Sequence, residues 1–183
     1  MFVKGSAFIV LLLASQFTFG QAARSDMQIA AAFDARVKAF IKFRDKVYKS
    51  VPAVKKDATP EEIQLYKDSL QKELIRRRAG AKEGNLFTPD SVVYFRRLIK
   101  KEFPGFEASE LRKQVLEADT KGAPVKVNAV YPDDKELVQM PPPLLLAMPQ
   151  LPKDLRYRFI GRSLVVMDRD GMLILDVMRN ALP

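Results

Sequence analysis

The chain of 183 residues contains no cysteine, no histidine and no tryptophan. Without Cys no disulfide can form, so stability must come from packing, for which this length is sufficient. Without His or Cys there is no Ser–His or Cys–His nucleophile, no imidazole base and no ordinary zinc or copper site. Any catalysis would depend on carboxylates, Lys, Tyr or an oxygen-bound cation. We therefore expect a non-enzymatic protein without a cofactor.

Long apolar runs are scarce as well, with one exception at the N-terminus. Met1 to Lys4 carries one positive charge, Ala7 to Phe19 is apolar, and small residues follow before Arg24. This order predicts a cleaved signal peptide over residues 1–22. The apolar run of 13 residues is shorter than the ~20 that span a bilayer. We expect export to the bacterial periplasm or the extracellular space, and one domain over residues 23–183.

Negative charge is under-represented, since the formal net charge is +9. Arg24 to Gly122 contains 22 basic and 15 acidic residues, a net charge of +7, whereas Ala123 to Pro183 contains 8 and 7, a net charge of +1. An anionic partner is therefore expected at the N-terminal half.

The N-terminal half shows helical periodicity. Ser25 is the expected N-cap of a helix over Asp26–Ser50, whose apolar residues recur at helical spacing. The sequence "TPEE" from Thr59 predicts a second helix that begins with a capping box, and its C′ residue is expected at Gly80. Two further helices are expected at Thr88–Phe103 and Ala108–Ala118.

The composition changes after Gly122. Val125 to Tyr131 alternates in the manner of a strand. Pro132 to Pro152 contains "MPPPLLLAMPQLP", whose prolines predict extended backbone. Its apolar side chains are expected to pack on the core: Leu144, Leu145, Leu146, Met148 and Leu151.

The stretch "LRYRFIGRSLVVMDRDGMLILDVM" (Leu155–Met178) predicts a three-stranded antiparallel meander. Its first strand alternates apolar residues with Arg156 and Arg158, which are expected on a wet face. Turns are expected at Gly161 and at the "DRDG" motif, where Gly171 would supply a positive φ.

These patterns predict an α+β fold in one domain. Three to four N-terminal helices (24–122) pack on a small C-terminal antiparallel sheet (123–183). The meander has three strands, to which the strand at Val125 would add a fourth.

Two groups of cations are candidate contacts for an anionic partner. The first is Arg76, Arg77 and Arg78 at the end of the second helix. The second, named here the basic strip, consists of Arg96, Arg97, Lys100 and Lys101. Its i,i+4 spacing places like charges side by side, which costs a few tenths of a kcal/mol each. A solvated helix face is the alternative interpretation. If the two groups converge on one surface, an anionic envelope component or an acidic protein is the expected partner. Nucleic acid is a poor candidate, since no aromatic-rich binding motif accompanies the cations.

Acidic residues give weaker signals. Asp168 and Asp170 of "DRDG" fit part of a calcium loop, but the first and twelfth positions would then be Val166 and Val177, so a simple turn is expected and no metal site. A carboxylate-dependent hydrolase acting on envelope glycan would need two facing acids, and no pair stands out. That activity is the alternative function.

The C-terminal third also resembles known sequences. "LLLAMPQLPKDLRYRFIGRSLVVMDRDGMLILDV" and "VNAVYP" are similar to the C-terminal segment of short exported bacterial proteins of unknown function. That segment has a Leu/Pro-rich lead, a "YRFxGR" strand and turn, and a hairpin with two Asp residues. A looser similarity is to the terminal hairpin of periplasmic nickel/cobalt-homeostasis proteins of the RcnB-like type. The resemblance implies export and a hairpin, and it assigns no site residue.

Overall fold

The structure is a computed structural model that describes residues 24–102, 106–118 and 120–182. The predicted signal peptide lies outside the described residues. The elements in chain order are α1 (Asp26–Ser50), α2 (Pro60–Arg77), α3 (Pro89–Glu102), α4 (Phe106–Glu117), α5 (Pro142–Ala147), β1 (Leu155–Ile160), β2 (Ser163–Asp168) and β3 (Ile174–Met178). Helices followed by a C-terminal antiparallel sheet confirm the predicted α+β fold class. No helix within the described ranges is long and apolar enough to cross a membrane.

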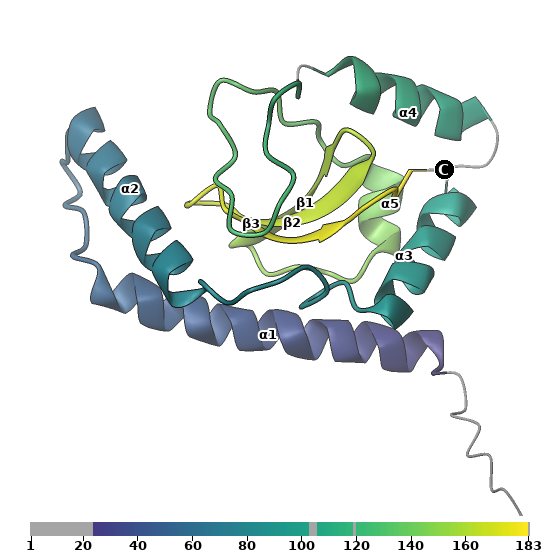
Figure 1. Cartoon of the computed structure of the whole chain (residues 1–183), viewed down its shortest axis with the longest axis horizontal. Coiled ribbons are helices and arrows are strands. Elements are labelled where there is room, and N and C mark those ends of the chain that lie inside the picture. The colour runs from purple at the N-terminus through teal and green to yellow at the C-terminus, as the bar shows by residue number, and fades with distance from the viewer. Residues whose placement is uncertain (1–23, 103–105, 119, 183) are drawn as a thin grey trace, which may run out of the picture.

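Helix α1 is the longest element, and α2 and α3 both contact it. Its start is fixed by a capping box, in which Ser25 accepts from the Gln28 amide and the Gln28 side chain accepts from the Ser25 amide. The helix ends at Ser50, and its C-cap Val51 is extended because Pro52 follows it. Figure 1 shows α2 packed near one end of α1 and α3 near the other, with the sheet between them.

Helix α2 begins as expected, since Thr59 and Glu62 form the predicted capping box. Its end differs from the prediction. The helix stops at Arg77, and Arg78 is the C-cap with a φ of −106°. Gly80 is not among the glycines with positive φ, so the prediction that it would be the C′ residue is wrong. The Arg78 amide itself satisfies the last carbonyls by donating to the carbonyls of Leu74 and Ile75.

The sheet is a meander with the order β1-β2-β3, and both pairings are antiparallel. The turn between β1 and β2 uses Gly161 at φ +50°. In the turn between β2 and β3 the positive φ of +48° belongs to Met172 and not to Gly171, so that detail of the prediction is wrong. Gly171 is needed for space instead, because a Cβ there would lie 3.2 Å from Asp168 Oδ1.

Both faces of the sheet are covered. On one face the rings of Phe33 from α1, Phe95 from α3 and Tyr157 from β1 pack against one another, with centroids 5.0 to 6.4 Å apart. On the other face Val165 and Met167 pack against the loop segment that contains Tyr131. This double burial explains why β2 and β3 read as nearly continuous apolar runs.

Two predictions for the segment between α4 and β1 need correction. Val125–Tyr131 is not a strand, because Asn128 has a φ of +63° and only Val130 forms a bridge, to Leu173. The Pro-rich segment is not wholly extended, since it contains α5. Pro141 is the N-cap of α5, with Pro142 and Pro143 in its first turn, where no amide donor is required.

The apolar side chains of this segment fall into a buried group and an exposed group. Leu144 and Met148 are buried against the core as expected. Leu145 and Leu146 are 44% and 78% exposed, so the prediction that all five apolar residues would pack inward is wrong. A six-residue helix turns successive side chains by about 100°, which leaves part of its circumference in water.

Candidate functional site

The predicted cations of α2 are engaged within the protein. Arg76 donates from Nε and Nη2 to the Glu73 carboxylate at 2.8 and 2.7 Å, and Arg77 Nε donates to the same group at 2.5 Å. Arg77 also donates to Ser50 Oγ at 3.0 Å. The hydrogen bonds from Arg76 and Arg77 lower the pKa of Glu73 to about 2. Glu73 therefore offsets part of the charge that the sequence offered to a partner.

Arg78 points into the molecule. Its Nε donates to Asn128 Oδ1 at 2.9 Å and its Nη2 to the Leu175 carbonyl at 2.8 Å, while Asn128 Nδ2 donates back to the Arg78 carbonyl at 2.6 Å. Burial lowers the pKa of Arg78, and the nearby Asp176 opposes that shift. Arg78 thus joins the end of α2 to the segment beside β3.

The basic strip faces solvent along α3. All four of its side chains are exposed. Arg97 pairs with Asp26 of α1, and Arg96 donates to the backbone carbonyl of the residue after β3 at 3.1 Å. Within the described ranges no ion pair involves Lys100 or Lys101. The strip therefore presents four cations against one carboxylate.

The structure does not bring these two groups of cations together. Arg77 contacts Ser50 at the last residue of α1, whereas Arg97 contacts Asp26 at the first. At a rise of 1.5 Å per residue, these two anchor points are about 36 Å apart. Figure 1 shows the same separation, with α2 and α3 near opposite ends of α1. The basic strip is the part of the predicted site that stays available at the surface.

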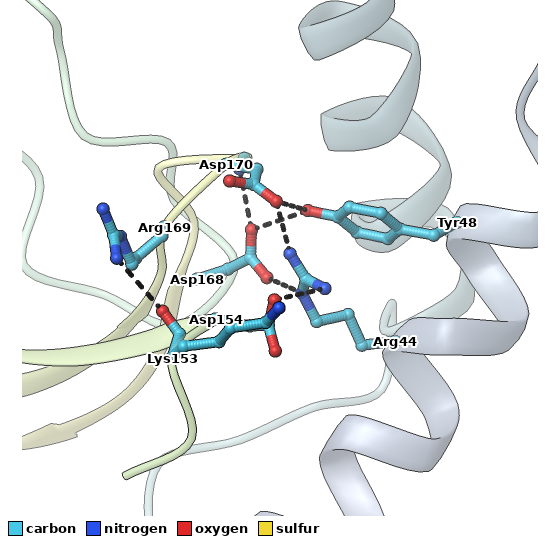
Figure 2. Close-up of polar contacts among 8 residues, drawn as sticks. Arg44, Tyr48, Lys153, Asp154, Asp168, Arg169 and Asp170 are labelled. Carbon is cyan, nitrogen blue, oxygen red and sulfur yellow. Dashed lines mark hydrogen bonds and ion pairs between the residues drawn. The ribbon is translucent and has the colours of Figure 1, made fainter. Parts of the chain in front are cut away.

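A polar network that the sequence did not indicate connects α1 with the turn between β2 and β3 (Figure 2). Arg44 is 4% exposed and Asp168 is fully buried. Arg44 Nε donates to Asp168 Oδ2 at 2.5 Å, Nη2 to Asp170 Oδ2 at 2.6 Å, and Nη1 lies 3.3 Å from Asp154 Oδ1. The hydroxyl of Tyr48 donates to Asp168 at 3.1 Å and lies 3.3 Å from Asp170. One guanidinium thus serves three carboxylates.

Electrostatics keep this network charged. Burial opposes the charge on Arg44, but the hydrogen bond and the charge of Asp168 outweigh it and raise the pKa of Arg44. Burial and the charge of Asp168 also raise the pKa of Tyr48, which stays protonated and donates. Its ring stacks on the guanidinium, whose carbon lies 3.8 Å from the ring centroid.

The network has the character of a structural tether. Asp168 Oδ1 also accepts from the Gly171 amide at 2.7 Å, so its acceptors are used within the protein. The two acids of "DRDG" therefore hold a turn and an arginine, and Arg44 occupies the space beside them. Among the described residues no group of three or more acids is arranged to hold a metal ion.

A second buried carboxylate, Asp176 of β3, anchors the loop before α3. Its oxygens accept from the amides of Gly84, Leu86 and Phe87 at 2.9, 2.6 and 2.8 Å. Backbone donors satisfy this charge in the way that a helix N-cap does. Asp168 and Asp176 are both fully buried and both shape the scaffold.

The sequence reasoning also missed the arginines of β1. Arg156 and Arg158 were expected on a wet face, yet both are half-buried. They line a cleft of ≈ 400 Å³ together with Arg169, Lys153 and apolar residues. The C-terminal half has a net charge of only +1, so its sequence does not indicate a cluster of cations. Its acidic residues balance these arginines in the sum but lie elsewhere in the structure. The alternation of Arg156 and Arg158 with apolar residues predicts that the two arginines share one face of the sheet. It does not predict that this face is partly covered.

Carboxylates line a different cleft. Glu117 at the end of α4 and Glu136 belong to a polar cleft of ≈ 530 Å³. Gln114 and Gln139 complete its polar lining. This is a place within the described residues where two acids share a concave surface, as the alternative hydrolase requires.

Comparisons with known proteins add no assignment: no family model, no curated protein and no solved structure matches the chain. The resemblance of the C-terminal third to short exported bacterial proteins stays a prediction.

Proposed function

We propose that the protein is a non-enzymatic binding or accessory protein of the bacterial envelope, which contacts an anionic envelope component or an acidic partner protein. Export is inferred from the predicted signal peptide. The contact is made by the basic strip on α3. One observation carries this proposal: Lys100, Lys101 and Arg96 project into solvent without a carboxylate partner among the described residues, although like charges at helical spacing repel.

The strip is preferred over the α2 cations for a physical reason. A side chain that already donates to Glu73 or to a backbone carbonyl would have to exchange that contact for one with the partner. Lys100 and Lys101 have no such contact to give up among the described residues, so hydration and salt screening alone limit their interaction with an anion.

The test is capture of envelope material on the immobilised protein at low and high salt. The triple variant R96E/K100E/K101E keeps the Arg97–Asp26 pair intact. A matched variant, K42E/K46E/K49E, reverses three exposed charges on α1 and likewise removes a cation from the last turn of a helix. We expect retention to fall only in the strip variant and to weaken at about 0.5 M salt, where screening is short-ranged. Equal losses in both variants, or retention that ignores salt, would reject the proposal.

The second candidate function is a carboxylate-dependent hydrolase acting on envelope glycan, and the observation that favours it is the cleft with Glu117 and Glu136. Its test is release of soluble fragments from purified envelope glycan. If each of the single variants E117Q and E136Q loses the activity, the hydrolase is established, since such enzymes need both acids. Absence of release by the wild-type protein would remove it.

A further inference from the structure

Three arginines gather at the edge of the sheet on the side away from α1, and we term their surroundings the arginine cleft. Arg156 and Arg158 lie two residues apart on β1, opposite Met167 and Val165 of β2, so both belong to one face of the sheet. Arg169 follows β2 and completes the group. Figure 2 shows Arg169 extending to the other side of the turn from Arg44.

Part of this charge is buried without a partner. The Nε atoms of Arg156 and Arg158 are inaccessible to solvent and have no hydrogen-bond partner among the described residues. Burial lowers the pKa of both arginines. For Arg156, repulsion from Arg169 adds to this shift and the charges of Asp168 and Asp170 oppose it. For Arg158, repulsion from Arg156 and Arg169 adds to it. Removing a guanidinium from water costs free energy, and a buried donor without an acceptor lowers the stability of the fold.

The acids that could neutralise the cleft are engaged elsewhere. Asp154, Asp168 and Asp170 all bind Arg44 on the α1 side of the turn. The contacts that the arginines do make are neutral: Arg156 donates to Met172 Sδ at 2.6 Å, Arg158 to the Tyr157 carbonyl at 2.7 Å, and Arg169 to the Lys153 carbonyl at 3.3 Å. These three carboxylates thus form their ion pairs with Arg44, while the three arginines of the cleft form no ion pair among the described residues.

The cleft has an apolar wall beside the cationic one. Leu145, Leu151 and Pro152 line it, and Leu145 is 44% exposed while its neighbour Leu146 is 78% exposed. The volume of ≈ 400 Å³ falls in the range of small-ligand sites. A ligand that fits would carry a compact anion with several acceptor oxygens next to an apolar group.

From this arrangement we infer that the arginine cleft binds an organic phosphate whose phosphate contacts Arg156, Arg158 and Arg169 and whose apolar substituent lies against Leu145 and Leu151. Phosphate has three acceptor oxygens and up to two negative charges, which suits the forked donors of several arginines. The same chemistry is offered by a soluble phosphate monoester and by the headgroup of an anionic lipid. The inference does not depend on the basic strip, which lies on a different element.

The test measures binding of hexyl phosphate by calorimetry at constant ionic strength. Inorganic phosphate, hexanoate and hexanol are the reference ligands. We expect hexyl phosphate to bind at least about tenfold more tightly than each of them, because only it offers both parts. Vesicles of phosphatidic acid and of phosphatidylcholine form the second arm: binding to the former alone indicates a lipid headgroup, and binding of hexyl phosphate without either vesicle indicates a soluble monoester. Both results support the inference.

The variants are Arg158→Gln and the safer Arg169→Gln, whose side chain is exposed. We expect each to weaken hexyl phosphate binding about tenfold, the size of one charge-assisted contact. Arg36→Gln is the matched control, because Arg36 is also half-buried and also donates to a backbone carbonyl, that of Ala32. In the absence of ligand, Arg158→Gln should unfold at the same or a higher temperature than the wild type.

Unchanged binding in both cleft variants, or preference for hexanoate over hexyl phosphate, would overturn the inference. Loss of binding in R96E/K100E/K101E as well would point to net charge alone and overturn it too.

Discussion

Arg44 of α1 and Asp168 of β2 are separated by 124 positions in the chain, and their side chains meet at 2.5 Å in the interior. Asp168 is fully buried and Arg44 is 4% exposed. The pair joins the longest helix to the last hairpin, and Asp170, Asp154 and the Tyr48 hydroxyl complete the arrangement. A buried pair of this kind need not exceed an apolar pair in stability, but each partner depends on the other.

The first prediction concerns the loss of one partner. Arg44→Met leaves the Asp168 carboxylate buried without its cation, so we expect the free energy of unfolding to fall by about 3–5 kcal/mol. The double variant R44M/D168N should recover part of that loss, because the charge is removed while an acceptor for the Gly171 amide remains. Urea denaturation measures both. A loss below about 1 kcal/mol in R44M, the range of exposed pairs, would contradict the tether.

The second prediction concerns Asp176 and the loop before α3. Asp176→Asn replaces the carboxylate with a neutral amide, so the Leu86 and Phe87 amides, which both donate to Oδ2, lose their charged acceptor. We expect a loss of about 2–3 kcal/mol and faster hydrogen exchange at these two amides. Asp45→Asn, at an exposed acid of α1, is the control for removal of one negative charge. Unchanged exchange at both amides would show that the carboxylate does not hold this loop.

The third prediction uses the low pKa of Glu73. Its carboxylate is stabilised by Arg76 and Arg77, which lower its pKa from 4.5 to about 2. A depressed pKa contributes stability above the unfolded value, and the contribution is lost as the pH falls from 4.5 toward 2. Carbon-detected NMR titration should find Glu73 still ionised at a pH well below 4.5, the ordinary pKa of a glutamate side chain. In R76Q/R77Q the midpoint should return toward 4.5, and a midpoint that stays near 2 would exclude the arginines as its cause.

Local signals in the sequence were sufficient for most of the fold. The N-cap at Ser25 and the capping box at Thr59 depend on residues within one helical turn, so the sequence was enough to predict them. The same holds for the alternation that predicts β1 and for Gly161 in its turn. α5 was missed because three prolines suggest extended backbone unless their position at a helix start is considered.

The candidate sites were harder to predict because they depend on contacts between distant segments. Arg44 lies in a helical pattern among other charged residues, and its partners lie more than 100 positions away. The net charge of each half was misleading in the same way. The helical half has the larger positive excess, yet Arg76 and Arg77 are offset by Glu73. The nearly neutral half contains Arg158, whose buried Nε has no hydrogen-bond partner among the described residues. Charge per segment does not reveal which acid meets which base.

The last prediction concerns alkaline pH. Burial and the charge of Asp168 raise the pKa of the Tyr48 hydroxyl above its ordinary value of 10.0. A raised pKa contributes stability that is complete below the unfolded value and is lost as the pH rises above it, because the unfolded chain releases this proton first. Each such group therefore costs up to about 1.4 kcal/mol per pH unit above pH 10.

Tyr48→Phe separates this effect from the loss of the hydrogen bond. At about pH 8 the variant should be less stable than the wild type by about 1 kcal/mol, since the hydroxyl donates to Asp168. Between about pH 8 and pH 11 that difference should shrink by about 1.4 kcal/mol, because the variant has no phenol at this position to ionise in the unfolded state. Urea denaturation at each pH measures it, with tyrosinate absorbance as a check that Tyr48 stays protonated in the folded protein. A constant difference across this range would mean that the Tyr48 hydroxyl ionises at the same pH in both states, and that the network does not hold its proton.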